Sequence, residues 1–379
     1  HSIRQWHLQE MLNMSGIVGD NLGTASGLVK SATDAPDSGS SDPTVSTNPS
    51  AVGDRFINTT SGELFVATDV TAGENVWKGQ LGTDVEPPKF YGGRGTMAGG
   101  TDGAASINII DYVTIASLGD ATDFGDLVTA REMGGHGASN GSRGVMAGGA
   151  ASSNVMEYIT FATTGNTTDF GDLTVGRHGG PDGCSNGTRG VFGAGYEAPS
   201  PYFSNVIDYI TIASAANATD FGDLTIGRSG QGGCSSDVRG LWFGGHSGSI
   251  NDVIDFVVLA STGNATDFGD LTVARQSGVA GCSNTTRGLM AGGAAPAYSD
   301  VIDYVTIAST GNATDFGNLT VARGGIDGFS DGTKGMFAGD YHGSVTDVID
   351  YVNVASIGDA SDFGNLTDAR YETSTMSGD

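Results

Sequence analysis

Positive charge is scarce in this 379-residue sequence, which has 17 lysines and arginines against 43 acidic residues and a formal net charge of −26. Nucleic-acid binding needs clustered Lys and Arg to neutralise phosphates, so this balance argues against a nucleic-acid partner. Twelve of the cations lie after residue 90, each in a slot that recurs along the chain. None is therefore left to form a basic patch or an isolated arginine cluster.

Cysteine is also rare. Cys184, Cys234 and Cys282 each lie in a G-C-S setting, their spacings match no metal motif, and an odd number argues against a disulfide framework. We expect small buried thiols. No stretch approaches the roughly 18 apolar residues of a membrane span, and no G-x-x-x-x-G-K phosphate loop is present. No signal peptide is visible, and His1 in place of Met indicates a processed or truncated start.

Glycine is abundant, with 63 residues, and it follows a repeat. The nonapeptide D-F-G-D-L-T-V-A-R at 267–275 occurs six times with few changes, and its copies begin at Asp123, Asp169, Asp220, Asp267, Asp315 and Asp362 and end at Arg131, Arg177, Arg228, Arg275, Arg323 and Arg370. A second cation marks the start of each repeat, at Arg94, Arg143, Arg189, Arg239, Arg287 and Lys334. A period of this length indicates a propeller or another repeat array.

Each repeat contains four segments with strand character. The repeat that starts at Arg287 has an apolar R-G-L-M-A-G-G and then V-I-D-Y-V-T-I-A-S at 301–309, which is rich in β-branched and aromatic residues. A turn G-N-A-T-D-F-G follows, and L-T-V-A-R leaves it as a third strand. The small-residue segment at 275–284 supplies the fourth. Four strands in about 48 residues match one blade of a β-propeller.

This order of segments resembles the kelch repeat, whose blades form β-propellers. The tryptophan usual in the kelch fourth strand is absent, and we expect the Phe of D-F-G to take over its packing role. The wording R-G-V-F-x-x-G and V-I-D-Y-I-T-I-A-S-x-x-N-A-T-D-F-G-D-L is similar to repeat proteins of bacteriophage virions, especially fibre-like proteins of marine phages. The resemblance covers residues 90–379 and implies an all-β, six-bladed kelch-like propeller.

The phase of the repeat predicts how the propeller closes. The chain enters at Arg94 on the second strand of a blade and leaves through A-R-Y-E-T-S-T-M-S-G-D, the first-strand segment of the next blade. Residues 370–378 should therefore lie beside residues 94–100 and leave no free edge. In the alternative, residues 89–93 supply the missing strand and the C-terminus is loose.

Three segments precede the repeats. Residues 1–30 are expected to form an attachment segment with a short helix. Residues 31–50, rich in Ser, Thr, Asp and Pro, are typical of an extended linker. Residues 51–82 predict a small β-hairpin unit, because apolar residues alternate around a Gly-containing turn. In that unit we expect three buried aromatic residues, Phe56, Phe65 and Trp77. Its phrase G-D-R-F-I-N-T-T-S-G-E-L-F-V-A-T-D also resembles a short module of phage fibre proteins.

Charged residues that recur in every repeat are expected to be structural. Each repeated Arg would bond backbone carbonyls or a carboxylate between blades, while the Asp and Gly of D-F-G set the turn. The acids in the second-named strand are expected to make structural hydrogen bonds, and they are Asp111, Glu157, Asp208, Asp255, Asp303 and Asp350. Asp120, Asp123 and Asp126 have a spacing that could suit calcium, but the other repeats do not keep it. We therefore predict no metal and no cofactor.

The loops between the first two segments of each repeat break the symmetry. Binding residues concentrate in variable loops on a rigid scaffold, and aromatic faces suit sugar rings. The candidate contact residues in these loops are Tyr196, Tyr202, Phe203, His246, Tyr298, Tyr341 and His342. The alternative, that they are tolerated loop variation, stays open.

Together these observations favour a non-enzymatic structural or host-recognition protein of a phage virion, a component of a tail fibre or appendage without membrane insertion. Its N-terminal segment would contact other virion proteins or form a trimer, and its propeller would bind a cell-surface glycan. Two alternatives stay open. A glycan-processing propeller enzyme of the sialidase or galactose-oxidase type would need a unique His, Tyr, Cys or carboxylate constellation at the axis, which the repeats do not show. A kelch interaction adaptor would also fit the fold.

Overall fold

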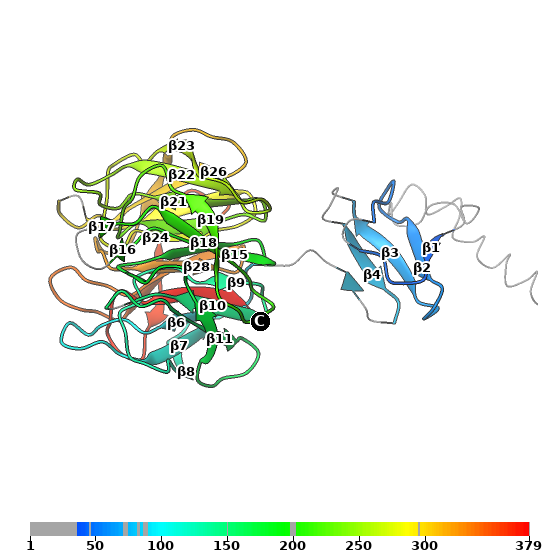
Figure 1. Ribbon diagram of the computed structural model, residues 1–379, viewed down its shortest axis with the longest axis horizontal. Helices are drawn as coiled ribbons and strands as arrows, with labels where there is room; N and C mark the ends of the chain where they lie inside the picture. Colours follow the sequence, from blue (N-terminus) through cyan, green and yellow to red (C-terminus); the bar gives the residue numbers. More distant parts are fainter. Residues whose placement is uncertain are drawn as a thin grey trace, which may run out of the picture. The chain divides into compact units, whose positions relative to one another are not determined.

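The computed structural model describes residues 36–44, 47–70, 75–81, 84–85, 90–149, 151–197, 202–294 and 296–378, and these form strands and turns with no helix (Figure 1). The chain divides into two compact units between residues 87 and 88. No helix long and apolar enough to span a membrane occurs in the described part. The helix expected within residues 1–30 lies outside it.

The first unit is a five-stranded sheet of β1 (Asp37–Gly39), β2 (Arg55–Asn58), β3 (Leu64–Asp69), β4 (Val76–Gly79) and β5 (Asp84–Val85), in that order. Phe56, Phe65 and Trp77 are buried in its core, as predicted. The composition of residues 31–50 predicts a linker throughout, but residues 37–39 form β1, which pairs in parallel with β2. The hairpin supplies the backbone edge that a short polar segment can join.

The second unit contains six four-stranded antiparallel sheets, which we call the repeat sheets. In each, the strands lie in the order inner, second, third and outer. The inner strands are β32 (Ser374–Gly378), β9 (Ala138–Ser139), β14 (Asp182–Ser185), β20 (Gly232–Ser235), β24 (Ala280–Ser283) and β28 (Asp327–Ser330). The second strands are β6 (Arg94–Ala98), β10 (Arg143–Ala147), β15 (Arg189–Gly193), β21 (Arg239–Phe243), β25 (Arg287–Ala291) and β29 (Lys334–Ala338).

The third strands are β7 (Ile109–Thr114), β11 (Val155–Thr160), β18 (Val206–Thr211), β22 (Val253–Val258), β26 (Val301–Thr306) and β30 (Val348–Asn353). The outer strands are β8 (Thr122–Asp126), β12 (Thr168–Asp172), β19 (Thr219–Asp223), β23 (Thr266–Asp270), β27 (Thr314–Asn318) and β31 (Ser361–Asn365). A short additional sheet joins β13 (Arg177–His178), β16 (Tyr196–Glu197) and β17 (Tyr202–Phe203).

Apolar cores lie between consecutive repeat sheets. Inner strands are buried throughout, and small residues such as the A-G-C-S of β24 allow them to approach one another. In the outer strands the Phe of D-F-G is the one large side chain that is buried, and in each repeat its ring lies edge-on to a Tyr or Phe of the third strand, as Phe268 does to Phe256 at 5.8 Å. Burial of such a ring contributes about 1.5–3 kcal/mol, so the expected packing role of this Phe is confirmed.

Consecutive inner strands are spatial neighbours: β9 contacts β14, the series continues through β20, β24 and β28, and β32 contacts both β28 and β9. This arrangement is consistent with a β-propeller (Figure 1). The C-terminal strand β32 pairs with β6 from Ser374 opposite Ala98 to Gly378 opposite Arg94. The predicted pairing of residues 370–378 with residues 94–100 is therefore confirmed, and residues 89–93 do not supply this strand.

One predicted strand is wrong. L-T-V-A-R at 271–275 lies outside the strands, whereas T-D-F-G-D, expected to end a turn, forms the outer strand β23. Gly269 explains the difference: its φ is +147°, and a Cβ there would lie 2.5 Å from the carbonyl oxygen of Gly311 in the next repeat. The glycine thus serves close packing between neighbouring sheets, and the residues after it turn toward the next sheet's acid.

Candidate functional site

The recurring arginines and third-strand acids form one ion pair at each junction between consecutive repeat sheets. Arg228 Nη2 lies 3.0 Å from Asp255 Oδ2, with both side chains fully buried. The other pairs are Arg131–Glu157, Arg177–Asp208, Arg275–Asp303, Arg323–Asp350 and Arg370–Asp111. Burial lowers the pKa of Arg228 and raises that of Asp255, while each partner's charge opposes the shift. The structural role expected of these residues is confirmed.

The aspartates of D-F-G do not take part in these pairs. Asp123, Asp169, Asp220, Asp267, Asp315 and Asp362 are exposed residues of the outer strands. Their expected role in setting a turn is therefore wrong, because the D-F-G segment continues a strand.

The cations that start the repeats also join consecutive sheets. Arg287 lies over the ring of Tyr304 at 4.5 Å, and its Nη1 donates to the carbonyl of Val354 in the next repeat at 2.9 Å. Lys334 in the last repeat donates to the carbonyl of Ile115 in the first, also at 2.9 Å. The cysteines are equally structural: all three are buried free thiols of inner strands, and burial raises the pKa of Cys234 to about 12.

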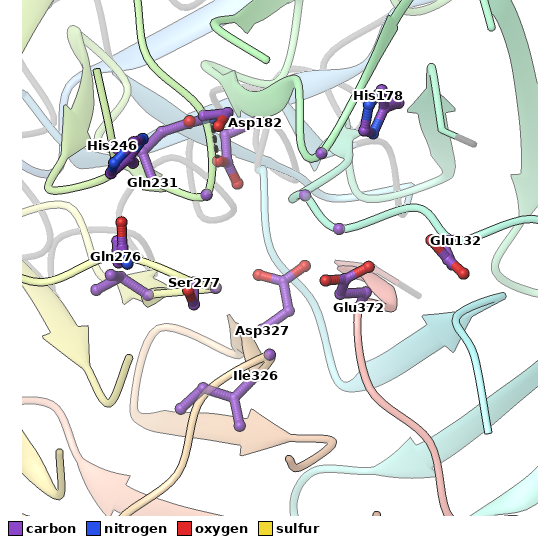
Figure 2. Close-up of a pocket in the computed structure, with 18 of the residues that line it drawn as sticks. Glu132, His178, Asp182, Gln231, His246, Gln276, Ser277, Ile326, Asp327 and Glu372 are labelled. Carbon is purple, nitrogen blue, oxygen red and sulfur yellow. Dashed lines mark hydrogen bonds between the residues drawn. The ribbon is translucent and has the colours of Figure 1, made fainter. Parts of the chain in front are cut away.

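A cavity of about 460 Å³ opens where the six inner strands meet, and we call it the central cavity. Residues at or just before every inner strand line it, among them Glu132, Asp182, Gln231, Val279, Asp327 and Glu372. Figure 2 shows Asp182, Asp327 and Glu372 turned toward the same space from different parts of the chain. The repeated framework thus surrounds an asymmetric set of side chains.

Two repeat slots supply six of the residues that line the cavity. The residue after the repeated Arg is Glu132, His178, Ser229, Gln276, Gly324 or Tyr371, and the first four of these line the cavity. The second slot lies on the inner strand, two residues before Ala138, Cys184, Cys234, Cys282, Phe329 or Met376. It holds His136, Asp182, Gly232, Ala280, Asp327 or Ser374. The chemical type of the side chain at these two positions therefore differs from repeat to repeat, although the backbone structure around them is the same.

In this second slot, His136, Asp182 and Asp327 come together. His136 Nδ1 lies 2.7 Å from Asp327 Oδ1, and the backbone N–H of His136 donates to Asp182 Oδ1 at 3.0 Å. Gln231 Nε2 donates to Asp182 Oδ2 at 2.7 Å (Figure 2). Burial, and next the negative charge of Asp327, hold the pKa of Asp182 well above its usual range. Two buried carboxylates that line the cavity, those of Asp182 and Asp327, thus lie beside the imidazole of His136.

Nearer the opening, Glu372 faces the same space (Figure 2). Burial, and then the neighbouring charge of Glu132, raise the pKa of Glu372 to about 7. Its carboxyl group therefore changes charge near neutral pH, and it can either donate or accept a hydrogen bond there.

The expected absence of a unique constellation at the axis is thus wrong. His, Asp and Glu side chains from different repeats do meet there. The sequence signal lies in the inner-strand segment, where H-G-A-S, D-G-C-S and D-G-F-S differ in their first residue. The small residues that these segments share conceal that difference.

The predicted loop residues fall into two groups. Tyr196 and His246 line the cavity, and the ring of Phe203 lies 5.0 Å from Tyr196 and 5.3 Å from His246. His178, which the sequence did not single out, stacks on Tyr196 at 5.2 Å. The side chain of Tyr202 lies outside the described residues.

The second group lies apart from the cavity lining. Tyr341 is 6.0 Å from Tyr298 and 5.0 Å from Tyr371, ring centre to ring centre. His342 bonds Asp340 at 2.8 Å. None of these side chains lines the central cavity.

The carboxylates considered for calcium do not gather. Asp120 Oδ1 accepts a hydrogen bond from the backbone N–H of Asn365 at 3.1 Å, which is a contact between the last and first repeats. Among the described residues, the one group of His, Cys, Asp and Glu close enough to hold a metal ion is His136, Asp182 and Asp327.

The chain matches no protein-family model, and a comparison with curated proteins found no match either.

Proposed function

We propose that this chain is a glycan-binding component of a phage tail fibre or appendage, in which a closed six-bladed kelch-like propeller offers the central cavity to a cell-surface glycan. The observation that carries the binding proposal is the row of rings His178, Tyr196, Phe203 and His246 at the edge of a cavity lined by carboxylates and amides.

The closed propeller is supported by contacts that join the last repeat to the first. β32 pairs with β6, Arg370 pairs with Asp111, and Lys334 donates to the carbonyl of Ile115. Each contact has counterparts at other junctions between repeat sheets. A ring of six equivalent blades accounts for this regularity, and the order of the segments in each repeat resembles that of the kelch repeat.

Sugar binding suits the chemistry of the cavity. A volume of about 460 Å³ is in the range of small-ligand sites. Aromatic rings such as Tyr196 offer flat faces to the C–H side of a sugar. Gln231, Gln276 and Glu372 offer amide and carboxyl groups to its hydroxyls. The acidic lining favours neutral or amino sugars over anionic ones.

The virion location is supported by the wording of the repeats and of residues 53–69, both similar to phage fibre proteins. In this proposal residues 1–30 contact other virion proteins or form a trimer, and the propeller faces the host. Electron microscopy of purified particles labelled with an antibody to residues 90–379 tests it. Label on a fibre or appendage is expected, and label absent from intact particles would contradict the proposal.

The glycan proposal is tested with a glycan array followed by titration of the best ligand. Tyr196→Ala should weaken binding about tenfold, because an aromatic contact contributes about 0.5–1.5 kcal/mol. Tyr298→Ala is the matched control, since this Tyr belongs to the aromatic group outside the cavity. Equal loss in both variants, or binding by neither the native protein nor its variants, would contradict the proposal.

A glycan-processing enzyme is the second candidate, favoured by the carboxyl groups of Asp182, Asp327 and Glu372 around one cavity. A carboxyl group with a pKa of about 7, as in Glu372, is suited to general acid catalysis. Incubation of array-positive oligosaccharides with the protein distinguishes the two. Binding without turnover supports a receptor-binding protein, whereas cleavage that Glu372→Gln abolishes supports the enzyme.

A further inference from the structure

We propose that His136, Asp182 and Asp327 bind one divalent transition-metal ion, Zn²⁺ in preference to Ca²⁺ or Mg²⁺, at the inner end of the central cavity. One potential ligand atom of each residue lies within 4.8 Å of the others. His136 belongs to the segment before β9, Asp182 to β14 and Asp327 to β28. The site thus joins three repeats through the space where their inner strands meet.

The residues found at this repeat position in the six repeats support a metal-binding site. The other three repeats have Gly232, Ala280 and Ser374 in the same place. The register is shared: Asp182, Gly232 and Ala280 each pair with the last residue of the second strand of their sheet. Three ligand-type side chains therefore point into one layer, and small residues complete that layer and leave room for an ion.

Backbone donors already orient the carboxylates. Asp182 Oδ1 accepts from the N–H of His136 at 3.0 Å, and Asp327 Oδ2 accepts from the N–H of Thr375 at 3.1 Å. Hydrogen bonds of this kind fix ligating groups in metal sites. Asp327 Oδ1 also accepts from the N–H of Gly328 at 2.9 Å, and each carboxylate keeps at least one lone pair that these bonds do not use.

Gln231 provides an independent observation. Its side chain is only 2% exposed and lines the cavity, and its Nε2 donates to Asp182. Its Oε1 has no hydrogen-bond partner among the described residues. Leaving a buried amide oxygen without a partner is unfavourable. A metal ion coordinated by this oxygen, or a metal-bound water that donates to it, would remove that cost.

The local charge also favours a dication. Asp182 and Asp327 are buried beside a single imidazole. Arg228, a cation whose charge acts on Asp182, is paired with Asp255 at 3.0 Å.

The donor set selects the class of metal. Imidazole nitrogen together with carboxylate oxygen suits Zn²⁺ and its neighbours, which take four to six ligands. Calcium requires six to eight oxygen ligands and magnesium a near-ideal octahedron of oxygens, neither of which this cluster offers. This proposal concerns metal binding alone. It is tested in the absence of sugar, so its outcome does not depend on whether the protein binds a glycan.

Calorimetric titration of the chelator-treated full chain with ZnCl₂, CaCl₂ and MgCl₂ tests the proposal. We expect one Zn²⁺ per chain, and at least tenfold weaker binding of Zn²⁺ by Asp327→Asn and by His136→Gln. His342→Ala is the matched control, because His342 and Asp340 form another His–Asp pair at 2.8 Å and, among the described residues, no second carboxylate lies close enough to form a metal site with them. Absence of Zn²⁺ binding, or equal loss in the control, would overturn the proposal.

A spectroscopic measurement on the native protein covers the case in which a cluster variant does not fold. X-ray absorption of the Zn²⁺-loaded chain should show a nitrogen and oxygen shell with imidazole scattering. A sulfur shell would assign the ion to the cysteines, and a shell without imidazole would place it on surface carboxylates. Either result overturns the assignment to His136, Asp182 and Asp327.

Discussion

Arg370, at the end of the last repeat, lies 2.9 Å from the carboxylate of Asp111 in the first, and neither side chain is exposed. The two residues are 259 positions apart in the sequence, yet they form the same pair that joins the other repeat sheets. The nearby pairing of β32 with β6 makes this contact possible. The junction between the last and the first repeat thus contains the same ion pair as the junctions between repeats that are consecutive in the sequence.

Breaking this pair should destabilise the protein strongly. Arg370→Ala leaves the buried Asp111 without its cation, which costs about 3–5 kcal/mol, and chemical denaturation measures the loss in free energy of unfolding. Asp123→Asn is the control, because Asp123 lies opposite Asp111 in the sheet but is exposed. That change should stay within about 0.5 kcal/mol. Similar effects of the two substitutions would refute the structural role of the pair.

Close packing at the D-F-G glycine is the second prediction. Gly269→Ala should lower the free energy of unfolding by on the order of 3 kcal/mol, because its Cβ would meet the carbonyl oxygen of Gly311 at 2.5 Å. Gly311→Ala has a similar φ, +158°, but no atom within 4 Å of the added Cβ. It should cost only the backbone strain, about 1 kcal/mol. Thermal and urea unfolding of both variants separate the cost of the steric clash at residue 269 from the cost of backbone strain alone at residue 311. Equal losses of unfolding free energy in the two variants would argue against the packing role of Gly269.

The third prediction concerns pH. The folded pKa of Glu372 is about 7, above its ordinary value of 4.5, so the folded state holds this proton more tightly than the unfolded state. Stability from this group is therefore complete below about pH 4.5 and is lost as the pH rises through 7. Glu372→Gln should be more stable than the native protein at pH 8, by on the order of 2–3 kcal/mol.

Unfolding free energies of the native protein and Glu372→Gln, measured from pH 5 to pH 8, test this prediction. The difference between the two proteins should increase from pH 5 to about pH 7 and then level off, because above its folded pKa Glu372 is ionised in both the folded and the unfolded state. Parallel curves would show that Glu372 keeps an ordinary pKa in the folded state.

Thiol reactivity is the fourth prediction. Cys184, Cys234 and Cys282 are buried, and burial raises each thiol's pKa, to about 12 for Cys234. The thiolate is the reactive form, so a chromogenic disulfide reagent should label none of them at pH 8 in the native state. All three should react after unfolding in guanidinium. Rapid labelling of the native protein would contradict the inner-strand packing of these residues.

The sequence predicted most of the strands and the pairing of residues 370–378 with residues 94–100 well, because periodicity and repeat phase depend on local residues and on counting. Arg94 begins a second strand and the segment before Gly378 supplies its inner neighbour, as the phase required. The sequence was less informative about the backbone conformation of the D-F-G segment. Whether Gly269 ends a turn or continues a strand depends on the approach of Gly311 from the next repeat, and no local pattern contains that information.

The candidate site was only partly predictable. Tyr196 and His246 were found because variable loops attract binding residues. His136, Asp182 and Asp327 were missed because they lie 46 and 145 residues apart along the chain and meet only when the inner strands surround one space. Comparing the same slot in all six repeats would have indicated them, since a repeat array places equivalent positions in one layer.

The central claim is that this cavity is where the chain binds its ligand, and a crystal structure of the protein with its best glycan from the array tests it most directly. The account predicts a sugar ring against Tyr196 and His246, with hydroxyl groups toward Glu372 and Gln231. A sugar bound instead at Tyr298, Tyr341 and Tyr371, with the central cavity empty, would contradict it.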